Sequence, residues 1–148
     1  QQVSINTSES SPSNWSRCFR YGSGGSGVGA SAYVAAAICG NWMQESTLNP
    51  GQWELGHKQG FGLGQWTDNS ETNRRTKLLN WLQENGYASN DGNGQLAYFL
   101  YENIWYHSGV AANFDNLSAF VSSTSTDLSM LTEAFMRGWE GISDSSLS

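Results

Sequence analysis

The sequence predicts a single, mainly α domain with a small irregular hairpin. Apolar residues recur at helical spacing in several stretches, whereas no stretch alternates with period two for more than a few residues. Of the 148 residues, 38% are hydrophobic and 13% aromatic, which is enough for one substantial core and too little for two ordinary domains.

The first helix is expected over 32–45, where an alanine-rich apolar stretch follows Ser31, a residue that favours helix N-caps. Asn49, Pro50 and Gly51 should end it. A small irregular hairpin is expected next, at 52–66. Apolar stripes then predict four further helices, at 74–85, 94–107, 117–122 and 127–139.

The N-terminal part is expected to be a linker and a loop. Residues 1–12 are polar and serine-rich, so we assign them to a linker-like segment and 13–148 to the domain. A short amphipathic helix at 14–21 is followed by a glycine–serine loop at 22–29. No apolar run approaches the roughly 20 residues that cross a bilayer, so we predict no membrane insertion.

Charge argues against a nucleic-acid partner. Seven basic and thirteen acidic residues give a net charge of −6, and phosphate binding needs clustered Lys and Arg. The basic cluster of Arg74, Arg75 and Lys77 fits a solvated helix face.

Cysteine and histidine give weak signals. Cys18 and Cys39 could form one disulfide or none. Cys39 with His57 or His107 would make a cysteine peptidase, but a catalytic cysteine favours a helix N-terminus and Cys39 lies inside a predicted helix. The histidines lack metal-ligand spacing, so we predict no metal and no cofactor.

Glu45 is the strongest catalytic candidate. It lies seven residues after Ile38, which should place it on the apolar face that includes Trp42. Burial would favour a protonated acid that can donate to a leaving glycosidic oxygen. The alternative is an ordinary helix-end glutamate paired with Arg74, Arg75 or Arg137.

The segment 60–67, GFGLGQWT, predicts a wall of a binding groove. Glycine at every second position lets the backbone approach a ligand, Gln65 offers a two-sided amide, and Phe61 and Trp66 offer stacking faces. Taken alone, the same pattern also fits a tight hairpin with core aromatic residues.

These motifs carry a family resemblance. Glu45-Ser46, Asn49-Pro50 and the glycine-rich turn resemble the lysozyme-like superfamily, which includes lytic transglycosylases and goose-type lysozymes. CGNWMQESTLNPGQW at 39–53 with GFGLGQWT is most similar to the phage tail lysozyme family. The resemblance covers about residues 30–141 and implies a lysozyme-like fold.

The resemblance also implies that Glu45 is the general acid in cleaving the β-1,4-linked glycan of peptidoglycan. An inverting or retaining hydrolase needs a second carboxylate, for which Glu54, Asp68 and Glu140 are candidates. A lytic transglycosylase needs none, and a non-catalytic glycan-binding module is the rival reading. The expected groove residues are Trp53, Glu54, Phe61, Gly62, Leu63, Gln65, Trp66, Thr67, Tyr101 and Glu140.

The resemblance places the domain in a larger lysin or phage tail assembly, acting outside the cell or on the virion. The net charge of −6 gives no electrostatic steering toward an anionic wall, so we expect delivery by a tether.

Overall fold

The computed structural model describes residues 30–54 and 59–141 of the chain. These are mainly helical with one small antiparallel hairpin, which confirms the predicted fold class. The linker, the helix at 14–21 and the domain boundary after residue 12 lie outside the described residues. The elements are α2 (Ala32–Ser46), β1 (Gly60–Phe61), β2 (Trp66–Thr67), α3 (Arg74–Glu84), α4 (Gly92–Glu102), the 3-10 helix η1 (Gly109–Asn113), α5 (Leu117–Val121) and α6 (Leu128–Gly138).

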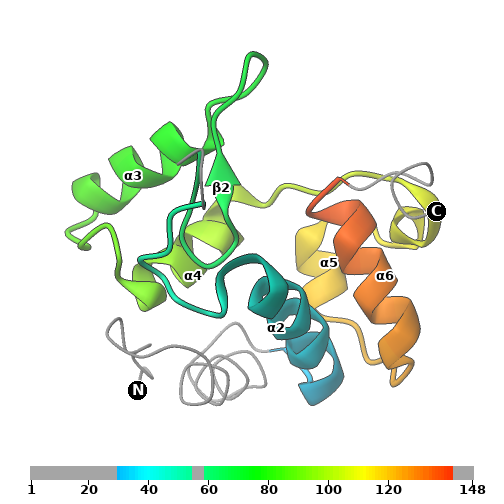
Figure 1. Ribbon diagram of the computed structural model, residues 1–148. Helices are drawn as coiled ribbons and strands as arrows, with labels where there is room; N and C mark the ends of the chain where they lie inside the picture. Colours follow the sequence, from blue (N-terminus) through cyan, green and yellow to red (C-terminus); the bar gives the residue numbers. More distant parts are fainter. Residues whose placement is uncertain (1–29, 55–58, 142–148) are drawn as a thin grey trace.

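The described elements form two sides joined by α2. Helices α3 and α4 and the hairpin lie on one side, and α5 and α6 lie on the other (Figure 1). Helix α2 packs on α6, α6 packs on η1, and α3 packs on α4 and β2. The C-terminal end of α2 therefore lies where the two sides meet.

Local capping sets the helix ends. The side chains of Ser31, Asp91 and Asp127 accept hydrogen bonds from backbone N–H groups in the first turns of α2, α4 and α6, at 3.1–3.2 Å. Thr47 ends α2 in the left-handed conformation, with φ of 51°. The predicted Ser31 cap is thus confirmed.

The helix predicted at 94–107 is shorter than expected and begins earlier. Asp91 caps it and the helix begins at Gly92, two residues before the predicted start, while Asn103 ends it with a left-handed φ of 50°. Ile104 and Trp105, which were expected on its apolar stripe, lie instead in the connection to η1.

Trp42 lies at the centre of an aromatic core. Its fully buried ring contacts four others at centroid distances of 5.0–6.2 Å, three of them in edge-on geometry. Such pairs contribute roughly 0.5–1.5 kcal/mol each beyond area burial. The contacts tie α2 to both sides of the molecule, because the partners are Trp66, Phe99, Phe135 and Trp139.

Cys39 is buried within α2 and is disulfide-bonded. Of the two outcomes left open for it, the bonded one is found, and Cys18 lies outside the described residues. Within 30–54 and 59–141, no helix is long and apolar enough to span a membrane.

Gln95 of α4 fastens the glycine-rich turn. Its fully buried amide accepts a hydrogen bond from Leu63 N at 2.9 Å and donates to Pro50 O at 2.8 Å and Ser89 O at 3.0 Å. Gly62 has a φ of +86°, and a Cβ there would lie 2.7 Å from Gln95 Oε1. The turn therefore needs glycine for conformation and for space.

Gly62→Ala should lower the free energy of unfolding by about 2–3 kcal/mol, because it adds a clash with Gln95 to the strain of a positive φ. Gly86→Ala is the matched control, since Gly86 has a φ of +79° with no atom near the added Cβ. We expect it to cost about 1 kcal/mol. Denaturant unfolding of both variants measures the difference, and equal losses would contradict the clash.

Candidate active site

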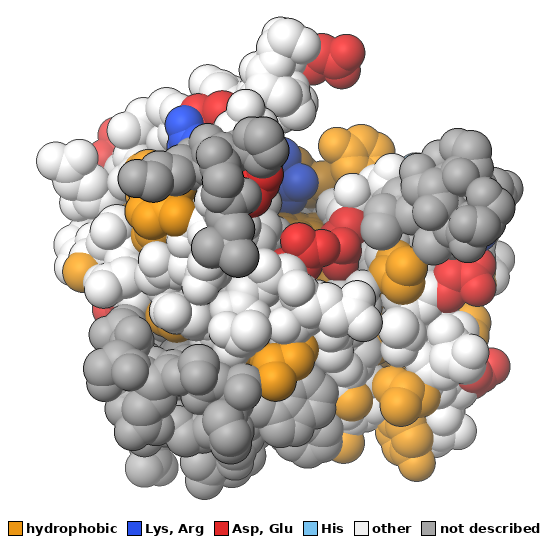
Figure 2. Space-filling view, viewed as in Figure 1, with side chains coloured by type: hydrophobic (Ala, Val, Ile, Leu, Met, Phe, Trp, Pro, Cys, Tyr) orange, Lys and Arg blue, Asp and Glu red, His pale blue; other side chains and the backbone are white. Residues whose placement is uncertain are grey.

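A hollow of about 580 Å³ opens where the two sides meet. Acidic side chains gather in it beside a basic one (Figure 2). Its lining comes from the end of α2, the glycine-rich turn, the start of α3, the connection after α4 and the end of α6. The lining residues are Glu45, Gly64, Gln65, Thr67, Asn69, Glu71, Thr72, Arg74, Tyr106, Ser108, Arg137, Trp139, Glu140 and Gly141.

Glu45 lies in the last turn of α2 and faces this hollow. The expectation that it is buried on the apolar face is wrong, because its side chain is exposed. The apolar face continues through Trp42 to Ser46, while the helix end projects past the core, so Glu45 has solvent beside it. The helical spacing alone could not show where the core ends.

Ser46 fixes the position of its neighbour Glu45. The buried Ser46 Oγ lies 2.8 Å from Leu63 O and 3.1 Å from Trp42 O and can donate to either. Leu63 N–H is bonded to Gln95 at the same time. The turn is thus held against both α2 and α4, which sets the distance from Glu45 to the groove wall.

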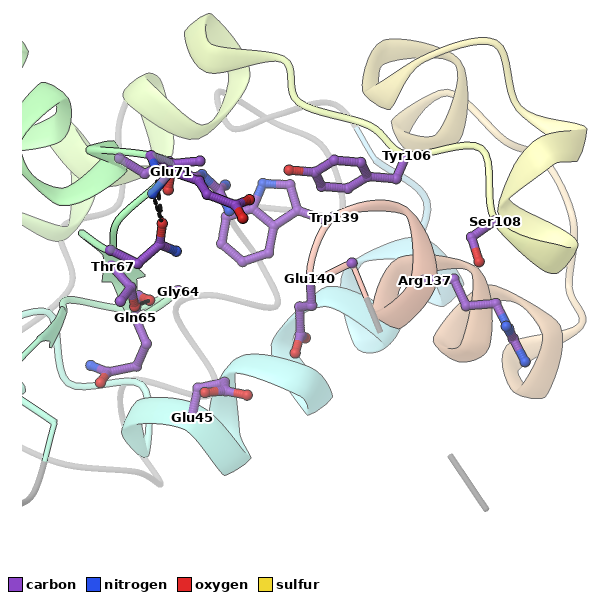
Figure 3. Close-up of a pocket in the computed structure, with 14 residues that line it drawn as sticks. Glu45, Gly64, Gln65, Thr67, Glu71, Tyr106, Ser108, Arg137, Trp139 and Glu140 are labelled. Atoms are coloured by element: carbon purple, nitrogen blue, oxygen red, sulfur yellow. Dashed lines mark hydrogen bonds between the residues drawn. The ribbon is translucent and has the colours of Figure 1, made fainter. Parts of the chain in front are cut away.

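Glu140 faces Glu45 from the other side of the hollow (Figure 3). It follows Trp139 at the end of α6 and is partly buried. Burial, then the negative charge of Glu45 and a hydrogen bond with its carboxyl, raise the pKa of Glu140 to about 8. Oε1 of Glu140 is itself buried without a hydrogen-bond partner among the described residues. Glu140 therefore keeps its proton near neutral pH, beside the carboxyl group of Glu45.

The arginines considered as alternative partners of Glu45 bind other carboxylates. The pairs are Arg74–Glu102, Arg75–Asp68 and Arg137–Glu133, with N–O distances of 2.9, 3.4 and 2.8 Å. The Arg74 guanidinium also lies 4.9 Å from the centroid of the Trp139 ring, on the wall of the hollow. Glu45 is therefore not an ordinary helix-end partner of these arginines.

Gln65 and Thr67 line the hollow, as expected. Gln65 has a φ of 54°, and its Nε2 donates to Gln52 O at 2.9 Å and to Gly62 O at 3.0 Å. Its amide nitrogen therefore stabilises the turn. Only the remaining polar atoms of this side chain are suited to a ligand.

Trp53 and Glu54 line a second hollow of about 450 Å³. Trp53 bridges to Phe61 in the sheet and keeps 40% of its surface exposed. Glu45 lines this hollow too, so the structure places both residues beside it.

Four other predicted groove residues lie beneath the surface. Phe61 and Trp66 are buried in the aromatic core, so neither ring offers the open stacking face expected from the sequence. Gly62 and Leu63 are buried as well. Hairpin residues were predicted to face a ligand, but here the core extends under the hairpin. These four residues shape the groove from below.

Tyr101 and Asp68 lie outside the lining of both hollows. Tyr101 is 68% exposed, and its ring packs beside those of Trp81 in α3 and Tyr98 in α4. Asp68 accepts hydrogen bonds from the Thr76 backbone and hydroxyl and so caps α3. Glu140 is thus the candidate second carboxylate that meets Glu45 directly, and Glu54 lies nearby.

Sequence reasoning missed Tyr106 and Trp139 as lining residues. Tyr106 was assigned to a helix, but it lies in the connection after α4, where its N–H donates to Gly138 O at 2.7 Å. Trp139 is buried in the core and also lines the hollow. In the segment Gly138-Trp139-Glu140-Gly141, the two flanking glycines indicate close packing around Trp139 and Glu140.

No metal site is evident in the described ranges, which contain no cluster of three His, Cys, Asp or Glu residues placed to hold an ion. The ring of His107 contacts Asp115 O at 2.9 Å. His57 lies outside the described residues.

Comparison with known proteins identifies a family and shows similarity to a phage protein. The profile of the phage tail lysozyme family matches residues 25–148. Morphogenesis protein 1 of Bacillus phage B103 is 42% identical over 73 residues, which cover 45% of this chain and 18% of that protein. The chain thus spans less than a fifth of the length of this relative.

The proton held by Glu140 should make stability fall as pH rises. The folded chain keeps this proton up to about pH 8, whereas an unfolded glutamate loses it near 4.5. Between these values the folded state binds more protons, so the free energy of unfolding decreases with pH.

Glu140→Gln removes that dependence. We expect it to match the parent near pH 4 and to be more stable by about 1–3 kcal/mol at pH 8, since a pKa unit corresponds to ~1.4 kcal/mol and solvent around Glu45 screens part of the effect. Denaturant unfolding across this range is the measurement, with the exposed Glu84→Gln as control. A difference that does not vary with pH would contradict the raised pKa of Glu140.

Proposed function

The chain belongs to the phage tail lysozyme family, and on that basis we propose that it cleaves β-1,4 bonds between N-acetylmuramic acid and N-acetylglucosamine in peptidoglycan. The observation that carries this proposal is the carboxyl pair of Glu45 and Glu140 in an open hollow. A glycosidase needs a carboxyl group that stays protonated near neutral pH beside a second carboxyl group, and the raised pKa of Glu140 beside Glu45 meets this need.

Glu45 is the general acid in this proposal. It is exposed and lines both hollows, so it can reach a glycosidic oxygen that lies between them. In the empty groove the proton lies mainly on Glu140. A bound glycan would exclude water from Glu45 and favour its neutral form, and the hydrogen bond between the carboxyl groups gives the proton a path to it.

Glu140 completes the cycle as the base. Once Glu45 has protonated the leaving oxygen, the Glu140 carboxylate takes a proton from the water that attacks the anomeric carbon. The water oxygen forms the new bond to that carbon, the bond to the leaving oxygen breaks, and the pair again holds one proton.

A second candidate reaction is that of a lytic transglycosylase. The direct contact between the two carboxyl groups favours it, because an inverting hydrolase keeps them roughly 6.5–9.5 Å apart to admit water. In that case the muramoyl 6-hydroxyl attacks intramolecularly, its proton passes to the carboxyl pair, and no water is consumed.

The groove residues have separate parts in this proposal. Trp53 offers a ring for stacking, and Glu54, Gln65 and Thr67 offer polar groups to sugar hydroxyl and acetamido substituents. The buried turn residues hold the wall in place.

We also propose that the chain works as the wall-cutting part of a larger lysin or phage tail protein, on the virion or outside the cell. Two findings support this: the family is that of tail lysozymes, and the relative in Bacillus phage B103 is several times longer than the matching segment. Peptidoglycan is the proposed partner.

Glu45→Gln should reduce the rate of peptidoglycan cleavage by about 10²-fold or more with folding intact, since loss of a general acid typically costs that much. Turbidity loss of purified cell walls measures cleavage, and thermal unfolding checks the fold. Glu84→Gln, an exposed glutamate outside both hollows, should leave the rate unchanged. Unchanged cleavage by Glu45→Gln would contradict the assigned acid, and no cleavage by the parent chain would favour a glycan-binding module.

Mass spectrometry of the digested strands distinguishes the two reactions. Hydrolysis yields a reducing end that accepts hydride from borohydride, whereas intramolecular attack yields an anhydro sugar that lacks one water and cannot be reduced. Which of the two sugars carries the new end identifies the bond that was cut.

A further inference from the structure

A buried carboxylate joins the hairpin to the start of α3. Glu102 is the last residue of α4, and its side chain is only 7% exposed. It accepts a hydrogen bond from Trp66 Nε1 at 3.1 Å and two from Arg74, from Nε at 3.0 Å and from Nη2 at 2.9 Å. Such a bidentate pair fixes the orientation of the guanidinium as well as the place of its charge. The proposed reaction gives no part to either residue of this pair.

The Arg74 guanidinium lies against the ring of Trp139. Its carbon is 4.9 Å from the ring centroid, a distance at which a cation is attracted to an aromatic face. Phe135 of α6 stacks on the same ring at a centroid distance of 5.4 Å and an interplanar angle of 6°. Gly64 of the turn is so close that a Cβ there would lie 2.4 Å from Trp139 Cη2. Arg74 thus supplies the contact that joins the start of α3 to the end of α6.

The position of Glu140 follows from that of Trp139. Trp139 is the C-cap of α6, where its N–H donates to Phe135 O at 2.9 Å, and Glu140 is the next residue. Both side chains line the hollow (Figure 3). A shift of the indole therefore displaces the carboxyl group that faces Glu45.

We propose that Arg74 is a positioning residue, which keeps the Glu140 carboxyl group buried beside Glu45. Glu102 fixes the guanidinium, and the guanidinium holds the Trp139 ring. The proposal rests on the proposed function, because that function is what requires the two carboxyl groups to stay together.

An effect of position differs in sign from an effect of charge. The charged or titratable groups that line the hollow with Glu140 are Glu45, Glu71, Arg74, Tyr106 and Arg137. Loss of a nearby positive charge would raise the pKa of Glu140, because its carboxylate would lose an attraction. Loss of the hold on the indole would expose Glu140 to water and lower its pKa toward 4.5 instead.

The test is a titration of the Glu140 carboxyl group by carbon-13 nuclear magnetic resonance, in the full chain with labelled glutamate. The signal is identified by its absence in Glu140→Gln. The variant combines Arg74→Met with Glu102→Gln, which leaves the net charge unchanged and no buried charge unpaired. We expect the pKa of Glu140 to fall from about 8 in the parent to about 7 or lower.

Arg75→Met combined with Asp68→Asn is the matched control. It removes a neighbouring ion pair that lies outside this hollow, so the titration of Glu140 should stay as in the parent. A merely structural role of Arg74 would lower the free energy of unfolding and leave the titration of the folded chain unchanged.

Arg74→Lys is a second test that keeps the positive charge. Lysine lacks the planar fork that bonds Glu102 twice and lies on Trp139, so we expect the pKa of Glu140 to fall by a smaller amount. This variant decides the matter if circular dichroism shows that the double variant does not fold. An unchanged or raised pKa in the double variant, or in Arg74→Lys where the double variant is unfolded, would overturn the proposal.

These outcomes are separate from those of the proposed function, because the titration needs no cleavage. If the parent chain does not cleave peptidoglycan but the double variant lowers the pKa of Glu140, the positioning role stands and the enzymatic role fails. If Glu45→Gln loses cleavage while the double variant titrates like the parent, the enzymatic role stands and the positioning role fails.

Discussion

The site depends on one constraint, the fastening of the glycine-rich turn between two helices. Leu63 is held at its N–H by Gln95 and at its carbonyl by Ser46, so a single peptide segment links α4 to the end of α2. All of these groups are buried, where an unpaired amide or carbonyl costs about 1–3 kcal/mol. Removing one partner therefore disturbs the others as well, and with them the distance between Glu45 and the opposite wall.

The site also requires two carboxyl groups to lie close together where water is partly excluded. Burial and the negative charge of Glu45 favour the neutral form of Glu140. At pH values above the ordinary pKa of glutamate, this arrangement lowers the free energy of unfolding. Aromatic packing around Trp42 offsets that cost, because it holds α2 against α6 and the hairpin at once. The core thus maintains a pair of charges that repel each other when both are ionised.

Local features of the sequence were sufficient for much of the fold. Ser31 and the apolar stripe of α2 are neighbours along the chain, so the helix and its cap could be predicted. Asn103 ends α4 by adopting a left-handed conformation, which composition does not specify. For the site, Glu45 and the turn were found by motif, but the exposure of Glu45 and the burial of Trp66 depend on how far the core extends. The contact with Glu140 joins distant positions and was one of several possibilities.

The packing of α2 on α6 has a consequence for how function is lost. Glu45 lies in α2 and Glu140 follows the end of α6, so both carboxyl groups remain in the chain if the two helices separate. What disappears is the effect of burial and of Glu45 on Glu140, whose pKa would then return toward its ordinary value. By the proposed mechanism, a small opening between the helices would separate the two carboxyl groups and stop cleavage while every helix is still formed. Circular dichroism would then overestimate the fraction of working molecules.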